Sequence, residues 1–159
     1  LRRYMFSLYD EAVRLRQQIE SIVSDDLPLF TSSFPINACK HASQLFCYHM
    51  GLKGYSEPLK VVFGVSNKRR GDVGHWWVET GGILIDLTAD QFNQIDDEEL
   101  SYKIRVNRKY RAVYCCPVSE APHYKVFSPI PRQAFIWDLS EISEDYIESL
   151  EGFYNLTSM

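Results

Sequence analysis

The sequence of 159 residues contains no long hydrophobic run. No apolar stretch approaches the roughly 20 consecutive residues that a membrane-spanning helix needs. The first residues, LRRY, lack the apolar region and small-residue cleavage site of a secretory signal. Because residue 1 is not methionine, we expect an excised domain or a processed product. These absences predict a protein that is not inserted into a membrane.

Cysteine is scarce, with four residues in the chain. Four cysteines are too few for a disulfide scaffold, and the adjacent pair Cys115 and Cys116 would strain a bridge between them. No pair has the C-x2-C spacing of a zinc site. The sequence therefore predicts free thiols in a reducing compartment, the cytoplasm or a host cell that the protein enters. One of these thiols is then available as a nucleophile.

An excess of positive charge is also missing, since 17 basic and 21 acidic residues give a net charge of −4. A net-acidic domain is a poor binder of nucleic-acid phosphates, so no nucleic acid is expected as a partner. Basic residues gather at positions 68–70 and 103–111. We expect solvated faces there, with steering of an acidic partner as the alternative for residues 68–70.

Hydrophobic residues make up 45% of the chain, which is enough for one folded domain spanning residues 1–159. Apolar side chains recur at steps of three and four in the predicted helices, and strand-like runs lie between them. This order predicts an α+β fold in which N-terminal helices pack on an antiparallel sheet. The predicted helices cover residues 4–24, 38–49 and 141–150, a short helical turn covers 96–100, and the predicted strands cover 59–65, 75–79, 83–87 and 112–116.

The predicted hairpin of residues 75–87 carries His75 and Asp86. In an antiparallel pair, directly opposed residues have a constant sum of residue numbers and point to the same face. A turn at residues 80–81 makes His75 and Asp86 direct partners, and a turn at residues 81–82 makes them diagonal neighbours on one face. Either register lets the carboxylate reach the imidazole, whereas an odd-length loop would separate them.

Cys39 lies where the second predicted helix begins. The free N–H groups and the dipole of a helix N-terminus favour a thiolate there. With His75 as the base and Asp86 fixing its tautomer, Cys39 would be a competent nucleophile. The backbone N–H of Cys39 and the side chain of Asn37 are candidate donors to a developing oxyanion.

Each of these residues also has an ordinary structural interpretation. Cys39 suits a helix interior, a strand histidine is often structural, Asn37 is well placed as an N-cap, and Asp86 can close a turn through Thr88. If the register slips, Glu79 or Asp90 replaces Asp86 as the carboxylate. The order of a helix-start cysteine followed by a hairpin with histidine and aspartate favours the catalytic interpretation.

Four segments in that order resemble the transglutaminase-like superfamily of papain-like cysteine enzymes. They read FPINAC at residues 34–39, ASQL at 42–45, GHWWVE at 74–79 and IDLTADQF at 85–92. The resemblance covers roughly residues 34 to 93 and implies a papain-like, transglutaminase-like core. The segments on either side, residues 1–33 and 94–159, match no family.

The resemblance implies that Cys39 is the nucleophile, His75 the base and Asp86 the orienting acid. Papain-type proteases carry a glutamine several residues before the cysteine as an oxyanion donor, whereas residues 31–33 of this chain are Thr, Ser and Ser. Asn37 or the backbone would have to replace it, which counts against peptidase activity of the papain type.

The expected function is that of a cysteine enzyme acting on glutamine carboxamides or peptide amides of a protein or peptide substrate through an acyl-enzyme. Deamidation, transglutamination and hydrolysis share that intermediate and stay open. Trp77, on the same strand face as His75, is expected to line the substrate cleft. No metal or organic cofactor is expected. The alternatives are an acyl-CoA-dependent N-acyltransferase with the same triad order and an inactive protein-binding module.

Overall fold

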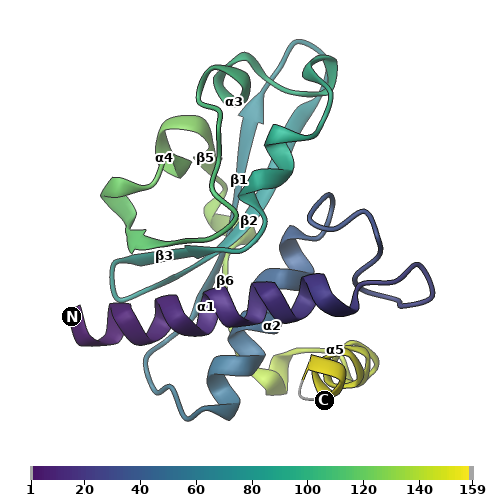
Figure 1. Ribbon diagram of the computed structural model, residues 1–159. Helices are drawn as coiled ribbons and strands as arrows, with labels where there is room; N and C mark the ends of the chain where they lie inside the picture. The colour runs from purple at the N-terminus through teal and green to yellow at the C-terminus, as the bar shows by residue number, and fades with distance from the viewer. Residues whose placement is uncertain (1, 158–159) are drawn as a thin grey trace.

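The computed structural model describes the backbone of residues 2–157 and the side chains of residues 7–157. Helices and strands alternate irregularly along the chain (Figure 1). The α-helices are α1 (Arg2–Ile22), α2 (Cys39–Leu52), α3 (Tyr102–Val106), α4 (His123–Val126) and α5 (Glu144–Thr157). The strands are β1 (Lys60–Asn67), β2 (Asp72–Thr80), β3 (Ile83–Asp86), β4 (Tyr114–Pro117), β5 (Ser128–Pro129) and β6 (Phe135–Ile136).

The strands form an antiparallel sheet in the order β4-β3-β2-β1-β5, and β6 also pairs with β1. The long strands β1 and β2 lie at its centre, and the shorter β3 joins β2 through a tight turn. This arrangement of helices on an antiparallel sheet confirms the predicted α+β class.

The turn between β2 and β3 lies at Gly81 and Gly82, whose φ angles of 53° and 80° suit glycine. Thr80 pairs with Ile83 across it. This is the second of the two predicted even-length registers. It places His75 and Asp86 as diagonal neighbours on one face of the sheet.

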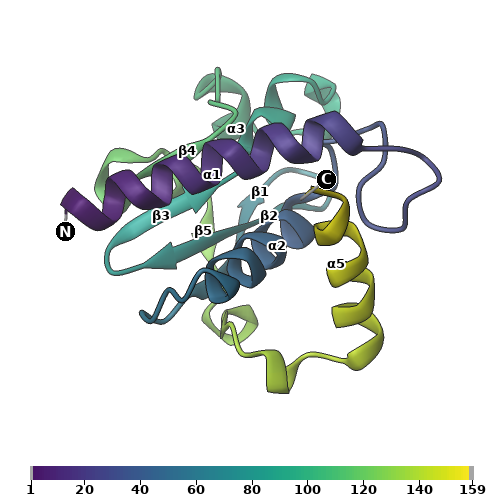
Figure 2. The same ribbon diagram turned by 60° about the horizontal axis from the view of Figure 1, so that its bottom comes forward.

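One face of the sheet packs against α1, α2 and α5, which gather on the same side in Figure 2. The apolar stripe predicted for the first helix is confirmed, because its side chains are almost completely buried against this face. They are Leu8, Ala12, Leu15 and Ile19. From the sheet, residues such as Val61, Val78 and Ile85 complete this core.

The opposite face holds a second core around Trp77, which has no exposed surface. The segments that cover it follow β3 along the chain and include the 3-10 helix η1 (Ala89–Asn93), α3 and α4. Because Trp77 and His75 point to the same side of β2, His75 is buried at the edge of this second core.

Several element boundaries differ from the predictions. Residues 66–74, which lie between two of the predicted strands, belong largely to β1 and β2, because the two strands stay paired as far as Asn67 and Asp72. Helix α2 continues past the predicted end at His49 to Leu52. The last helix begins at Glu144 and continues to Thr157, so its buried residues are Leu150, Phe153 and Thr157, and Ile142 precedes it. None of the described helices is long and apolar enough to cross a membrane.

Gly64 on β1 offers a direct test of the packing behind the sheet. A Cβ atom at this position would lie 2.8 Å from Cη2 of Trp77 and 2.9 Å from Cβ of Phe127. We therefore expect Gly64→Ala to lower the free energy of unfolding by about 1–3 kcal/mol, as overpacked cores do. Urea denaturation measures this change.

Gly152→Ala is the matched control for this substitution. Gly152 lies in α5, and a Cβ atom there would meet nothing within 4 Å. The free energy of unfolding of this variant should rise by up to about 1 kcal/mol, because alanine has a higher helix propensity than glycine. Equal stabilities of the two variants would contradict the tight contact at Gly64.

Candidate active site

Asp86, the last residue of β3, has a carboxylate that is almost completely buried. Its Oδ1 atom accepts a hydrogen bond from the backbone N–H of Thr88 at 2.8 Å. The predicted turn through Thr88 is therefore present, but it occupies only one of the two carboxylate oxygens. Oδ2 remains free to accept hydrogen bonds from the sheet and from α4.

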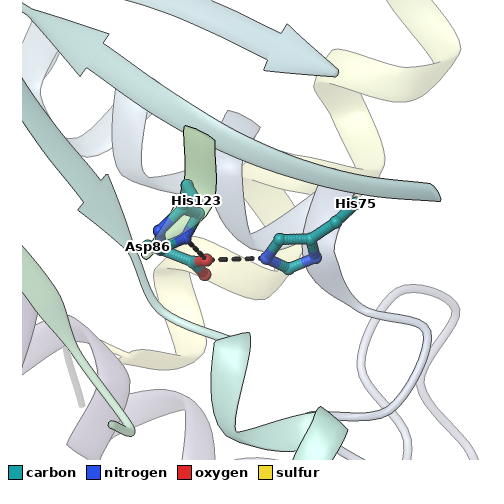
Figure 3. Close-up of side chains that lie close together, drawn as sticks. All are labelled: His75, Asp86 and His123. Carbon is teal, nitrogen blue, oxygen red and sulfur yellow. Dashed lines mark hydrogen bonds and ion pairs between the residues drawn. The ribbon is translucent and has the colours of Figure 1, made fainter. Parts of the chain in front are cut away.

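His75 lies on β2 and is completely buried. Its Nε2 atom is 2.6 Å from Oδ2 of Asp86, so the ring donates to the carboxylate (Figure 3). The predicted histidine–aspartate pair is thus formed in the diagonal register. Because Nε2 carries the proton of this hydrogen bond, Nδ1 is the ring atom left for other chemistry.

His123 is a partner that the sequence analysis missed. It is the first residue of α4, it is buried, and its Nε2 atom is also 2.6 Å from Oδ2 of Asp86. Figure 3 shows the two rings meeting the same oxygen from different directions. His123 lies 37 positions after Asp86 and outside the four segments that resemble the family. The sequence therefore contains no spacing that predicts a contact between the two residues.

Cys39 is the first residue of α2, as predicted, and its thiol is free and half-buried. Nδ1 of His75 is buried and makes no hydrogen bond. Asp86 and, after it, the nearby Cys39 thiol raise the pKa of His75. Cys39 and His75 are thus neighbours without a hydrogen bond at Nδ1, and their catalytic pairing stays a prediction.

The ionic state of the pair follows from burial and charge. Burial alone would lower the pKa of His75, but the charge and hydrogen bond of Asp86, together with Cys39, overcome it and raise the pKa to about 10. For Asp86, burial would raise the pKa, yet the charge of His75 and the hydrogen bonds from both histidines hold it well below its usual range. Near neutral pH, His75 is an imidazolium and Asp86 a carboxylate.

Asn37 is not the N-cap of α2, which corrects one of its two predicted roles. Ala38 occupies that position, because its carbonyl accepts the first helical hydrogen bond from Ala42. Asn37 has a φ of 60°, and its backbone N–H donates to Oε1 of Gln91. Its side chain is exposed two residues before Cys39. The role of Asn37 as an oxyanion donor stays a prediction.

Trp77, predicted to line the cleft, has no accessible surface. Its Nε1–H donates to Oε2 of Glu79 at 2.8 Å, and its ring packs edge-on against His123 with centroids 5.0 Å apart. In this structure Trp77 packs behind the two histidines, and its contact with a substrate stays a prediction.

Neither alternative carboxylate replaces Asp86. Glu79 accepts from Trp77 and from the hydroxyl of Tyr124. Asp90 accepts a two-pronged contact from the guanidinium of Arg16, with both distances 2.8 Å. Each of these carboxylates therefore has its own partners.

The remaining histidines are used elsewhere. Nδ1 of His41 is 2.9 Å from the hydroxyl of Tyr146 on α5. His49 is held between Tyr154 and Glu11, so it connects α2 with α5 and α1. These contacts hold both rings against other helices and leave neither bonded to Asp86.

The thiols other than Cys39 are poorly suited to be nucleophiles. Burial raises the pKa of Cys47 far above its usual value and that of Cys115 to about 12. Burial also raises the pKa of Cys116. None of the three has a histidine among the groups that shift its pKa.

His75, Asp86 and His123 form a group of potential metal ligands within the described residues, with one ligand atom of each within 4.8 Å of the others. A metal ion with bonds of about 2.0–2.1 Å would hold its ligand atoms roughly 3 Å or more apart. The two nitrogen–oxygen distances of 2.6 Å are instead those of hydrogen bonds. The Nδ1 atoms of both histidines also lack the partner that a metal-bound histidine usually has. The geometry fits a hydrogen-bonded relay better than a metal site.

The basic residues at positions 68–70 line a groove of about 880 Å³ at the tip of the β1–β2 hairpin. Arg105 from α3 and the exposed ring of Tyr102 lie on its other side. Asp97 and Glu98 also border it, so its charge is mixed. Steering of an acidic partner by this groove stays a prediction.

Comparisons of the chain with models of protein families, with curated proteins and with solved structures found no match.

Asp86→Asn tests the buried charge pair. Breaking such a pair by removing one partner costs about 3–5 kcal/mol. Because the pKa of His75 is raised from 6.5 to about 10, its stabilising contribution is complete below pH 6.5 and disappears as the pH rises to about 10. The stability lost in the variant should therefore be large at pH 6 and shrink towards pH 10, as measured by urea denaturation across that range.

Asp97→Asn is the control, because its ion pair with Arg108 is exposed. It should follow the wild-type stability at every pH. A stability difference between Asp86→Asn and wild type that does not change between pH 6 and 10 would contradict the ion pair.

Proposed function

We propose that this protein is a cysteine-dependent enzyme that transfers acyl groups from glutamine carboxamides or peptide amides of a protein or peptide substrate. The observation that carries the proposal is the buried hydrogen bond between His75 and Asp86, with Cys39 at the start of α2 near enough to His75 to contribute to its raised pKa. A half-exposed thiol next to a buried, carboxylate-held imidazole is the arrangement that thiol acyl transfer requires.

The proposed reaction begins with attack of the Cys39 thiolate on the carbonyl carbon of the amide. A carbon–sulfur bond forms, and the carbonyl electrons move to oxygen. When the tetrahedral species collapses, the carbon–nitrogen bond breaks and Nδ1 of the His75 imidazolium gives its proton to the departing ammonia or amine. The products of this half-reaction are a thioester on Cys39 and a neutral His75.

The second half-reaction resolves the thioester. Nδ1 of His75 takes a proton from water or from a second amine, which attacks the thioester carbon. The carbon–sulfur bond breaks, and the Cys39 thiolate and the His75 imidazolium are restored. Water gives deamidation or hydrolysis, whereas an amine gives a transferred amide.

The start of α2 supports stabilisation of the oxyanion. The N-cap residue Ala38 makes no side-chain hydrogen bond to the helix. The first N–H groups of an α-helix have no partner within the helix, so those at Cys39 and Lys40 are available to an oxygen beside the sulfur. Asn37 is the candidate side-chain donor, in place of the glutamine of papain-type proteases.

The family assignment is part of the proposal. A helix that begins at the nucleophile and packs on an antiparallel sheet carrying histidine and aspartate is the transglutaminase-like, papain-like arrangement that the motifs resemble. A thiol nucleophile works best in a reducing setting, so we place the enzyme in the cytoplasm or in a host cell into which it is delivered.

Alkylation of Cys39 gives the first test. With His75 and the N-terminus of α2 beside its sulfur, Cys39 should be modified by iodoacetamide at pH 6.5 at least ~10 times faster than the other three cysteines. Peptide mass spectrometry after timed quenching measures each site. His75→Gln should lower the rate at Cys39 by a similar factor, and Cys116→Ser should leave it unchanged. Alkylation of Cys39 no faster than an ordinary exposed thiol would overturn the enzyme proposal.

A turnover assay tests the reaction itself. Glutamine-containing peptides and casein are incubated with the protein, and released ammonia is measured with and without a primary amine that carries a fluorescent group. We expect ammonia release that Cys39→Ser reduces by at least ~1000-fold, since removal of a nucleophile abolishes the covalent path. Product that forms only when an acyl-CoA is added would instead support an N-acyltransferase. A reactive Cys39 with no turnover on any of these substrates would contradict the proposed glutamine and amide specificity.

A further inference from the structure

We propose that His123 is a positioning residue of this site, which holds Oδ2 of Asp86 so that His75 keeps its Nδ1 atom directed at Cys39. The catalytic meaning of this inference rests on the proposed function above. The influence of His123 on His75 through one shared carboxylate oxygen is geometric, and it does not depend on the proposed function.

The shared oxygen is the observation that carries the inference. The two Nε2–Oδ2 distances are equal at 2.6 Å, and all three side chains are at most 2% exposed. Both rings must donate, because an ionised carboxylate only accepts. Nε2 of each ring therefore carries a proton, and the tautomer of both histidines is fixed by the same oxygen.

A second donor changes what Asp86 does to His75. The hydrogen bond from His123 spreads the negative charge of the carboxylate, which weakens its hold on the proton of His75. Because Thr88 holds Oδ1 and His123 holds Oδ2, the plane of the Asp86 carboxylate is fixed without any contribution from His75. His75 is therefore oriented by a carboxylate that does not itself have to move.

Packing alone does not account for His123. Its ring lies edge-on to Trp77 and Tyr114, at centroid distances of 5.0 and 5.2 Å, a setting that phenylalanine would also fill. In the structure its Nδ1 atom is buried without a hydrogen-bond partner. A side chain that leaves one polar atom unpaired in an aromatic pocket needs a compensating contact, and the bond to Asp86 is that contact.

The experiment is a pH titration of His75 by long-range ¹H–¹⁵N NMR on the full chain, with His75→Gln to assign its signals. His123→Phe keeps a ring in the pocket without a donor, and His123→Gln replaces the ring with an amide N–H that can reach Asp86. Tyr124→Phe, which removes a neighbouring hydrogen bond to Glu79 from the same helix, is the control. The other ionisable groups that interact with His75 and Asp86 are Cys39 from α2 and Tyr114 from β4.

We expect the midpoint of the His75 titration to rise by about one pH unit in His123→Phe, the size expected for one lost hydrogen bond to a charged group. His123→Gln and Tyr124→Phe should titrate like wild type. In the same samples, the rate of Cys39 alkylation at pH 6.5 should fall about tenfold in His123→Phe and recover in His123→Gln.

The outcomes separate this inference from the proposed function. An unchanged His75 midpoint in folded His123→Phe would overturn the positioning role, even if Cys39 is reactive. A shifted midpoint in a protein whose Cys39 is unreactive would support the positioning role while the enzyme proposal fails. Micromolar binding of Zn²⁺ that shifts the signals of both histidines and disappears in His123→Phe would assign the three side chains to a metal site instead.

Discussion

The carboxylate of Asp86 is the constraint on which the rest of the site depends. A buried negative charge is tolerated only when donors surround it, and here the donors come from three separate parts of the chain. Thr88 lies two residues later in the sequence, His75 belongs to the neighbouring strand, and His123 begins a helix that covers the second core. Satisfying this one charge therefore fixes the end of β3, the start of α4 and the orientation of the histidine that faces Cys39.

A second buried charge connects this site with the helical layer. Arg16 from α1 binds Asp90 through two nitrogens and also donates to the carbonyls of Leu87 and Ala112. Leu87 and Asp90 lie one and four residues after Asp86, so α1 holds the segment through which the chain leaves the site. A planar guanidinium supplies several directed donors at once, which a lysine at the same position would not. Helix α1 therefore both packs on the sheet and holds the segment that follows Asp86.

The parts of this site that are local in sequence were predictable, and the long-range parts were not. The spacing of His75 and Asp86 across a short turn limits the register to a few choices, and the two glycines of the turn select one of them. Cys39 could be placed at a helix start from the apolar pattern that follows it. His123 could not be placed, because its contact with Asp86 depends on how the segment after β4 packs on the second core. Asn37 was predicted as an N-cap by residue type, but its left-handed backbone shifts the cap to Ala38.

The four side chains of the site differ in how deeply they are buried. Cys39 is half-buried, whereas His75, Asp86 and His123 have almost no exposed surface. In the proposed reaction the partly exposed Cys39 is the side of the site open to a substrate, and the three side chains behind it are closed to solvent. Nε2 of His75 is hydrogen-bonded to a carboxylate that water does not reach. The imidazole ring therefore cannot flip without breaking a charged hydrogen bond in a poorly solvated interior. The same burial that makes the charge costly to the fold keeps the imidazole of His75 in one orientation.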